Sequence, residues 1–227
     1  MEYTEYTFDY PLFMLLNFDG GPTADAFMAA VSGVKMWIPM YVLIIWLVWR
    51  RYGWRGTVLF VAAGAVAMGL SDMICGIFKH AGLLKHLWPS FPPRWRPMYT
   101  PALEGLDITP DSLMAWRKNP TDNLPAAVHL IRCGSRYGTV SAHAATIVSI
   151  AVLACKAIRM KWFTWFMAVV TVLICYSRIY LAYHFPGDIV LGAATGAAVG
   201  WASFRLFSAA RSALERQCAT TRRNNEE

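Results

Sequence analysis

Residues 162–207 read WFTWFMAVVTVLICYSRIY, LAYHFP and GDIVLGAATGAAVGWASFRLF, two apolar stretches of 19 and 21 residues joined by a six-residue link. A helix of about 20 apolar residues is long enough to cross the hydrocarbon core of a bilayer. The quoted stretch therefore predicts two antiparallel membrane-spanning helices that meet at the membrane surface in the link at 181–186. Further stretches of this kind lie at about 31–49, 57–78 and 139–155.

The composition is that of an integral membrane protein. Among 227 residues, 56% are hydrophobic and 15% are charged, whereas a soluble domain carries about 25% charged residues. These values exclude intrinsic disorder, collagen and small disulfide scaffolds. We expect residues 1–227 to form a single domain, an all-α integral membrane helical bundle with about five to six transmembrane helices. The apolar patches at 10–17 and 24–30 are too short to span, and we expect interfacial helices within 1–30.

The basic residues indicate which side of the membrane each connection faces, because cytoplasmic loops are enriched in Lys and Arg. They cluster at 50–55, at 156–161 and in the tail at 208–227, which we therefore place in the cytoplasm. The N-terminus, the long segment 79–138 and the link at 181–186 then face outward. That long segment also carries eight Lys and Arg residues, which a phosphate-binding role explains.

Ionisable residues at the ends of the predicted spans are candidates for function, because charged groups are costly in a membrane. Arg178 ends the span before the link, His184 lies in the link, and Asp188 lies in the first turn of the next helix. We expect Asp188 to bond a ring nitrogen of His184, which fixes the tautomer and makes the free nitrogen a better nucleophile. The alternative interpretation is an interfacial histidine beside an inert aspartate at a helix start.

Two more polar clusters are expected on the same side of the membrane. Ser141 is suited to cap the helix of the third span, whose free N–H groups favour an anion, and His143 beside it is suited to act as a general acid. After the second span come cations of the kind that bind phosphate oxygens: Lys79, Lys85, Arg94 and Arg96. The alternatives are an ordinary helix cap and a solvated basic loop that contacts anionic headgroups.

Taken together, the three clusters indicate transfer of a phosphoryl group through a phosphohistidine. A metal site is not expected, because the cations would repel a metal ion and the two histidines lack a carboxylate-rich set of further ligands.

Two motifs in these clusters resemble those of the type-2 phosphatidic acid phosphatases, membrane relatives of the vanadium haloperoxidases. The motif Ser-Arg-x5-His-x3-Asp is met in full by residues 177–188. The motif Pro-Ser-Gly-His appears at 140–143, with Val and Ala in place of Pro and Gly. The resemblance covers about residues 70–200, and the order of the motifs makes it specific.

The family's remaining motif, Lys-x6-Arg-Pro, is present in part. Arg96 is followed by proline, but no lysine stands seven residues before it. Lys79, at the end of the second span, is the preferred candidate and Lys85 is the alternative. Either choice implies an insertion before the arginine.

The resemblance implies a role for each matching residue. His184 would attack phosphorus, Asp188 would orient His184, and His143 would protonate the leaving oxygen. The remaining matching residues would hold the phosphate oxygens: Lys79 or Lys85, Arg96, Ser141, Ala142 and Arg178. The family implies no metal and no other cofactor.

We therefore expect a membrane-embedded lipid-phosphate phosphatase that hydrolyses a phosphate monoester or diphosphate. The family resemblance suggests undecaprenyl diphosphate, lipid A phosphate, phosphatidylglycerol phosphate or phosphatidic acid as the substrate. No nucleic-acid partner is expected. The expected location is a bacterial cytoplasmic (inner) membrane, with the active site on the periplasmic or extracytoplasmic face. The alternatives are a lipid phosphotransferase that uses the same histidine and a non-catalytic lipid-binding or transport protein on the same fold.

A stripe of glycines predicts how the helices pack. Gly192, Gly196 and Gly200 recur every four residues in the last span, a spacing that allows another helix to approach closely. We expect the stripe to hold the core of the bundle and to bring His184 against His143, rather than to form a dimer.

Overall fold

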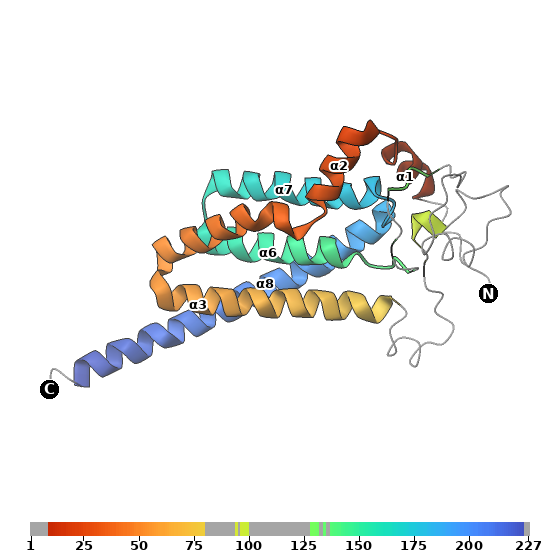
Figure 1. The fold of residues 1–227 in the computed structure, drawn as a ribbon. Helices are drawn as coiled ribbons and strands as arrows, with labels where there is room; N and C mark the ends of the chain where they lie inside the picture. Colours follow the sequence, from red (N-terminus) through yellow and green to blue (C-terminus); the bar gives the residue numbers. More distant parts are fainter. Residues whose placement is uncertain are drawn as a thin grey trace.

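The computed structural model describes residues 9–79, 94, 96–99, 128–131, 134 and 137–224. The long helices in this part of the chain pack side by side into an elongated bundle, with α1 and α2 at one end (Figure 1). The helical elements, in chain order, are α1 (Tyr10–Leu16), α2 (Gly21–Val31), η1 (Val34–Trp37), α3 (Ile38–Phe78), η2 (Pro97–Tyr99), α6 (Ala142–Ile158), α7 (Lys161–Tyr180) and α8 (Pro186–Asn224).

Helix α3 contains two antiparallel passes. At Gly53 the backbone has φ 67° and ψ −175°, a conformation that glycine adopts readily. The chain reverses direction there, so that the two halves of α3 lie side by side (Figure 1). The segments Val34–Phe78, Lys161–Tyr180 and Pro186–Gln217 are long and apolar enough to cross a membrane, and α6 is a shorter apolar helix. With the halves of α3 counted separately, these helices match the expected spans, and the all-α membrane bundle is confirmed.

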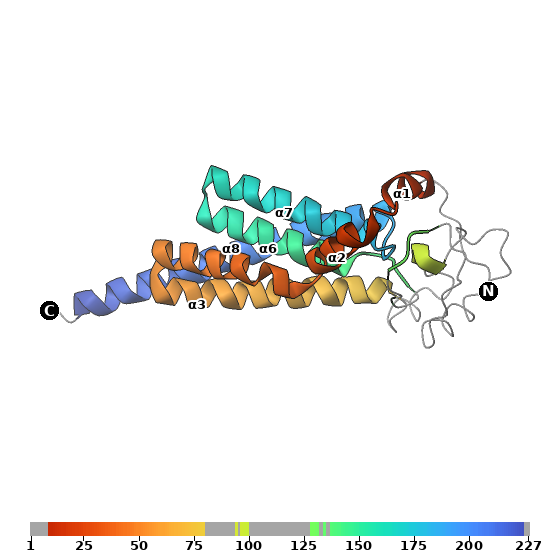
Figure 2. The same cartoon turned by 45° about the horizontal axis from the view of Figure 1, so that its top comes forward.

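Helix α6 forms the centre of the bundle and contacts α3, α7 and α8 (Figures 1 and 2). Its buried side chains include Leu153, Ala154 and Ala157, which share one apolar cluster with Met167 of α7 and Phe207 of α8. Burial of apolar area contributes about 25 cal/mol per Å² in water. Between helices in a membrane, close packing and hydrogen bonding are the main attractions instead.

The glycine stripe of α8 makes its contact with α6 a backbone-to-backbone contact. A β-carbon built on each of these glycines would lie 2.2–2.5 Å from a carbonyl oxygen of α6. The facing pairs are Gly192 with Ser141, Gly196 with Ala145, and Gly200 with Ser149. The stripe therefore holds the core of the bundle, as the sequence predicts.

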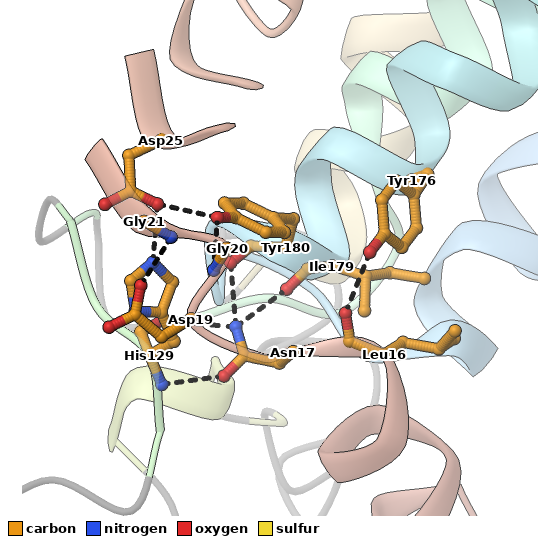
Figure 3. Close-up of polar contacts among 10 residues, drawn as sticks. All are labelled: Leu16, Asn17, Asp19, Gly20, Gly21, Asp25, His129, Tyr176, Ile179 and Tyr180. Atoms are coloured by element: carbon orange, nitrogen blue, oxygen red, sulfur yellow. Dashed lines mark hydrogen bonds and ion pairs between the residues drawn. The ribbon is translucent and has the colours of Figure 1, made fainter. Parts of the chain in front are cut away.

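A polar cluster fixes the two short N-terminal helices to the end of α7 (Figure 3). Asn17 donates from Nδ2 to the carbonyl oxygen of Tyr180 at 2.7 Å, and its Oδ1 accepts from the N–H of His129 at 2.8 Å. The Tyr180 hydroxyl donates to Asp25 of α2 at 2.6 Å, and the His129 ring nitrogen Nε2 lies 2.8 Å from the same carboxylate. Both short apolar patches thus form helices as predicted, and they are anchored where α7 leads into the link at 181–186.

Helix α8 continues well past the predicted end of the last span. It runs for 39 residues from Pro186 to Asn224. The residues at 208–224, expected as part of a cytoplasmic tail, extend this helix.

The close contact predicts the effect of a single methyl group. Gly196→Ala is expected to lower the free energy of unfolding by about 1–3 kcal/mol, the usual range for overpacking, because the new atom overlaps backbone of α6. Gly69→Ala in α3 is the matched control, since no described atom outside the adjacent backbone of its own helix lies within 4 Å of a β-carbon built there. The apparent Tm in detergent measures both variants. Equal Tm values for the two variants would contradict the backbone contact.

Candidate functional site

The link between α7 and α8 is a tight turn built around one carbonyl group. The N–H groups of Tyr183 and His184 both donate to the carbonyl oxygen of Arg178, at 2.9 and 3.3 Å. Ala182 takes up the reversal with a left-handed φ of 54°. The turn carries the His184 side chain into the protein, where it is 2% exposed.

A backbone carbonyl sets the tautomer of His184. Its ring nitrogen Nδ1 lies 2.9 Å from the carbonyl oxygen of Gly138. A carbonyl oxygen can only accept, so Nδ1 carries the proton and Nε2 keeps its lone pair. The expected bond from Asp188 is not formed, since its Oδ2 lies 3.9 Å from Nδ1, beyond hydrogen-bonding distance. The carbonyl group of Gly138 therefore orients the His184 ring, the role that the sequence predicts for Asp188.

Asp188 belongs to a buried ionic chain with the N-terminal segment. Its Oδ2 accepts from the N–H of Phe185 at 3.1 Å, and its Oδ1 accepts from Nη1 of Arg94 at 3.3 Å. Arg94 also pairs through Nη2 with Asp9, whose second oxygen accepts from the N–H of Gly187 at 2.9 Å. The three ionic side chains are 1–8% exposed. Burial disfavours lone charges, so each member of this chain depends on its partner.

The sequence alone does not predict this chain of ionic side chains. Asp9 lies in an acidic N-terminal stretch that offers no local signal for a partner 85 residues away. Arg94, which the sequence places among the phosphate-binding cations, is paired with the carboxylates of Asp9 and Asp188.

Three cations act on both histidines. Arg178, Arg96 and Lys79 each interact electrostatically with His184 and with His143. Complete burial, and then these positive charges, lower the pKa of His184 well below its usual value, although the Gly138 bond opposes the shift. Burial, and next the charge of Arg96, also lower the pKa of Lys79. The nucleophile candidate is thus held neutral in a strongly cationic setting.

The two arginines of this cluster share an aromatic wall. Their guanidinium carbons lie 4.2 Å (Arg178) and 5.3 Å (Arg96) from the ring centroid of Tyr183. Arg96 donates from Nε to the carbonyl oxygen of Tyr137 at 3.2 Å, and Arg178 donates from Nη1 to Ser32. The Arg178 Nε atom is buried and has no hydrogen-bond acceptor among the described residues. A buried donor of this kind is costly unless a ligand supplies the acceptor.

The start of α6 brings the other predicted groups to the same end of the bundle. Ser141 caps the helix, accepting from the N–H of Ala144 at 3.4 Å, and its own N–H donates to the carbonyl oxygen of Asp188 at 3.1 Å. Ala142 and His143 follow in the first turn. The free N–H groups of a helix start attract an anion.

His143 also lines an apolar cavity of about 430 Å³. The cavity walls come from α3, α6, α7 and the segment around η1, and they include Trp37, Met68 and Ile174. Asp72 of α3 is the one carboxylate of this wall within the described part of the chain. The cavity offers an apolar ligand a place beside a histidine.

Most of the predicted site residues therefore lie together at one end of the bundle. Lys79 is close enough to His184 and His143 to interact with them electrostatically, while its alternative as the motif lysine, Lys85, lies outside the described residues.

The lowered pKa of His184 has a consequence for stability. The unfolded chain protonates a histidine below about pH 6.5, whereas the folded protein resists it, so the stabilisation is present above that pH and is lost as the pH falls. Between about pH 6.5 and 5.5 the loss is about 1 kcal/mol, or roughly 2–4 °C in Tm. The decrease in apparent Tm is expected to be smaller in His184→Gln than in the wild type. Identical decreases would contradict a neutral buried His184.

Comparison with known proteins finds relatives in sequence and in fold. Two lipid A 4'-phosphatases are similar in sequence, one from Bacteroides thetaiotaomicron (29% identity, 87% of this chain and 76% of the relative) and one from Porphyromonas gingivalis (25%, 88% and 73%). Two crystal structures share the fold. Aquifex aeolicus LpxE matches with a TM-score of 0.59 and 18% identity over 90% of this chain and 99% of that one.

The other is a PAP2-type phosphatidylglycerolphosphate phosphatase from Bacillus subtilis, with a TM-score of 0.54 and 15% identity over 86% of this chain and 82% of that one. The family model of the PAP2 superfamily matches residues 60–212, which is more than half of the chain and includes most of the cationic cluster and both histidines. The chain thus belongs to the PAP2 superfamily.

Proposed function

We propose that this protein is a lipid-phosphate phosphatase that works through a phosphohistidine on His184. One observation carries the proposal: a buried, neutral histidine with Nε2 free lies within electrostatic range of Lys79, Arg96 and Arg178. A neutral imidazole is the nucleophilic form. The cations, and the buried Nε of Arg178 that lacks an acceptor in the described structure, suit the oxygens of a phosphoryl group.

The proposed reaction has two steps. Nε2 of His184 forms a bond to phosphorus while the bond from phosphorus to the lipid oxygen breaks, and His143 gives its proton to that oxygen. A water molecule then attacks phosphorus and passes its proton to His143, so that inorganic phosphate leaves and His184 is restored. Fixed cations stabilise the charge that develops on the phosphoryl oxygens.

The supporting groups have distinct tasks in this proposal. Lys79 (or Lys85), Arg96 and Arg178 hold the phosphate oxygens, with Ser141 and the N–H of Ala142 as neutral donors. Asp188 acts on His184 indirectly, by holding the start of α8 and the turn before it. Metal independence is part of the proposal and follows from the cationic character of the site.

The proposed substrate is a phosphate monoester or a diphosphate of a membrane lipid. The apolar cavity beside His143 can hold an acyl chain or another apolar part of such a lipid. Because the two curated relatives are lipid A 4'-phosphatases, we rank lipid A 4'-phosphate first. Phosphatidylglycerol phosphate, phosphatidic acid and undecaprenyl diphosphate follow. We place the site on the outer face of a bacterial inner membrane.

Phosphate release tests the proposal directly. Wild-type protein and His184→Ala, purified in detergent, are incubated with each of the four lipids in the presence of EDTA. The wild type is expected to release phosphate and His184→Ala to release none. Activity that disappears in EDTA would contradict the metal-free mechanism. Loss of lipid phosphate that requires an added acceptor, with little free phosphate, would identify a phosphotransferase instead.

Two arginines in neighbouring positions are expected to differ in their kinetic roles. Arg94→Gln breaks the ionic chain to Asp188 and should lower kcat roughly 10- to 100-fold, as loss of supporting contacts does at other sites, with little change in KM. Arg96→Gln removes a phosphate ligand and should raise KM as well. Asp9→Asn, a milder change in the same chain, should follow Arg94→Gln. A rise in KM for Arg94→Gln without a fall in kcat would contradict the positioning role.

A further inference from the structure

A second cavity lies between the turn of α3 and helix α8. Its volume is about 590 Å³, and its wall contains Arg51, Tyr52 and Arg55 from the turn and Arg211 and Glu215 from α8. None of these residues takes part in the proposed catalysis. The cavity therefore needs an explanation of its own.

The cavity lies at the opposite end of the bundle from the histidines. The second half of α3 begins at the cavity and ends next to Lys79, which interacts with His184. Exposed tryptophans mark the membrane surface at this end, because tryptophan favours the boundary between lipid and water. They are Trp49, Trp54, Trp162 and Trp165, with exposed fractions of 60, 66, 53 and 75%. The cavity thus lies at the depth of the lipid headgroups in the leaflet opposite the histidine site.

Contacts within the protein fix the shape of the cavity. The Tyr52 hydroxyl donates to the carbonyl oxygen of Ala157 at 2.7 Å, and Arg51 donates to the carbonyl oxygen of Ile158, which ties the turn to the end of α6. Both Arg51 and Arg211 lie over the Tyr52 ring, 5.6 and 4.8 Å from its centroid. Two of the guanidinium groups are thereby oriented before any ligand arrives, which reduces the entropy lost on binding.

The wall of the cavity is cationic. Its three arginines face one carboxylate, that of Glu215, so the net formal charge of the wall is +2. Glu215 accepts from Nε of Arg211 at 3.1 Å, but its side chain is 62% exposed. Its carboxylate can therefore move from Arg211 into water at little cost in free energy. Guanidinium groups bind phosphate oxygens through paired N–H donors. The cavity has the charge and the donors for one phosphate group.

We propose that this cavity binds the phosphodiester headgroup of an anionic glycerophospholipid from the leaflet opposite the histidine site. Basic pockets between membrane helices bind such headgroups in other proteins. A lipid is favoured over a free anion, because the cavity lies at headgroup depth and the apolar surface around Trp54 can receive the acyl chains. The bound lipid would join the α3 turn to α8 and stabilise the folded bundle by mass action.

Native mass spectrometry with phosphatidylglycerol as the probe tests the proposal. This lipid carries a phosphodiester and is not a phosphate monoester, so the proposed catalytic site does not consume it. The wild type is expected to retain one phosphatidylglycerol in preference to phosphatidylcholine. The double variant Arg55→Gln/Arg211→Gln should bind it about thirtyfold more weakly, since each arginine near a headgroup contributes roughly a fivefold change.

Two further variants distinguish binding in the cavity from a general effect of the protein's positive charge. Arg216→Gln is the matched control on the same helix: it removes the same charge from an exposed residue outside the cavity wall, and it should bind like the wild type. Glu215→Gln removes the competing carboxylate and should bind more tightly, which a purely structural role for the pair with Arg211 does not predict.

Several outcomes would overturn the proposal. Equal binding by the double variant and the wild type would do so, as would equal retention of phosphatidylglycerol and phosphatidylcholine. Inorganic phosphate that raises the apparent Tm of the wild type as much as phosphatidylglycerol, and that raises the Tm of the double variant less, would identify a site for a free anion in this cavity instead. In phosphatidylcholine, the double variant should release phosphate from a lipid-phosphate substrate as fast as the wild type does. A failure of the lipid-binding proposal is therefore distinguishable from a failure of the proposed phosphatase function.

Discussion

The close approach of α8 to α6 is the constraint on which the rest of the structure depends. Gly192 faces the carbonyl oxygen of Ser141, two residues before His143, and the N–H of Ser141 donates to the carbonyl oxygen of Asp188. His184 lies just before α8. The two histidines are therefore positioned by main-chain contacts between two helices, and long side chains play little part in setting their separation. Such contacts require small residues, because lipid gives the helices no hydrophobic reason to associate.

The charges near the histidines are sorted into two environments. Lys79, Arg96 and Arg178 repel one another, and a phosphoryl group would relieve that repulsion. Arg94, only two residues from Arg96, is separated from them by its pairing with Asp9 and Asp188. Asp9 and Asp188 are thus paired with Arg94 and not with the three cations around the histidines, and Asp188 still holds the start of α8 in place.

The helical architecture could be predicted from the sequence because it depends on local patterns. The apolar stretches predicted the spans, and the repeat from Gly192 to Gly200 predicted the central contact. The partner of Nδ1 of His184 could not be predicted, because it is the main-chain oxygen of Gly138, and any residue type supplies such an oxygen. The pairing of Asp9 with Arg94 depends on how the N-terminal helices dock on α7, which a sequence pattern does not encode. The choice of Lys79 over Lys85 rests on its position at the end of the second span.

The unbroken length of α8 has a mechanical consequence. At 1.5 Å per residue, Asp188 lies about 12 Å and Arg211 about 22 Å from Gly196, on opposite sides of it. With the glycine contact as a fulcrum, a tilt that displaces Arg211 by about 2 Å would displace Asp188 by about 1 Å in the opposite direction. The helix would behave as a lever with unequal arms. A displacement at the membrane surface near Arg211 would reach the surface near Asp188 reduced by about half and in the opposite direction.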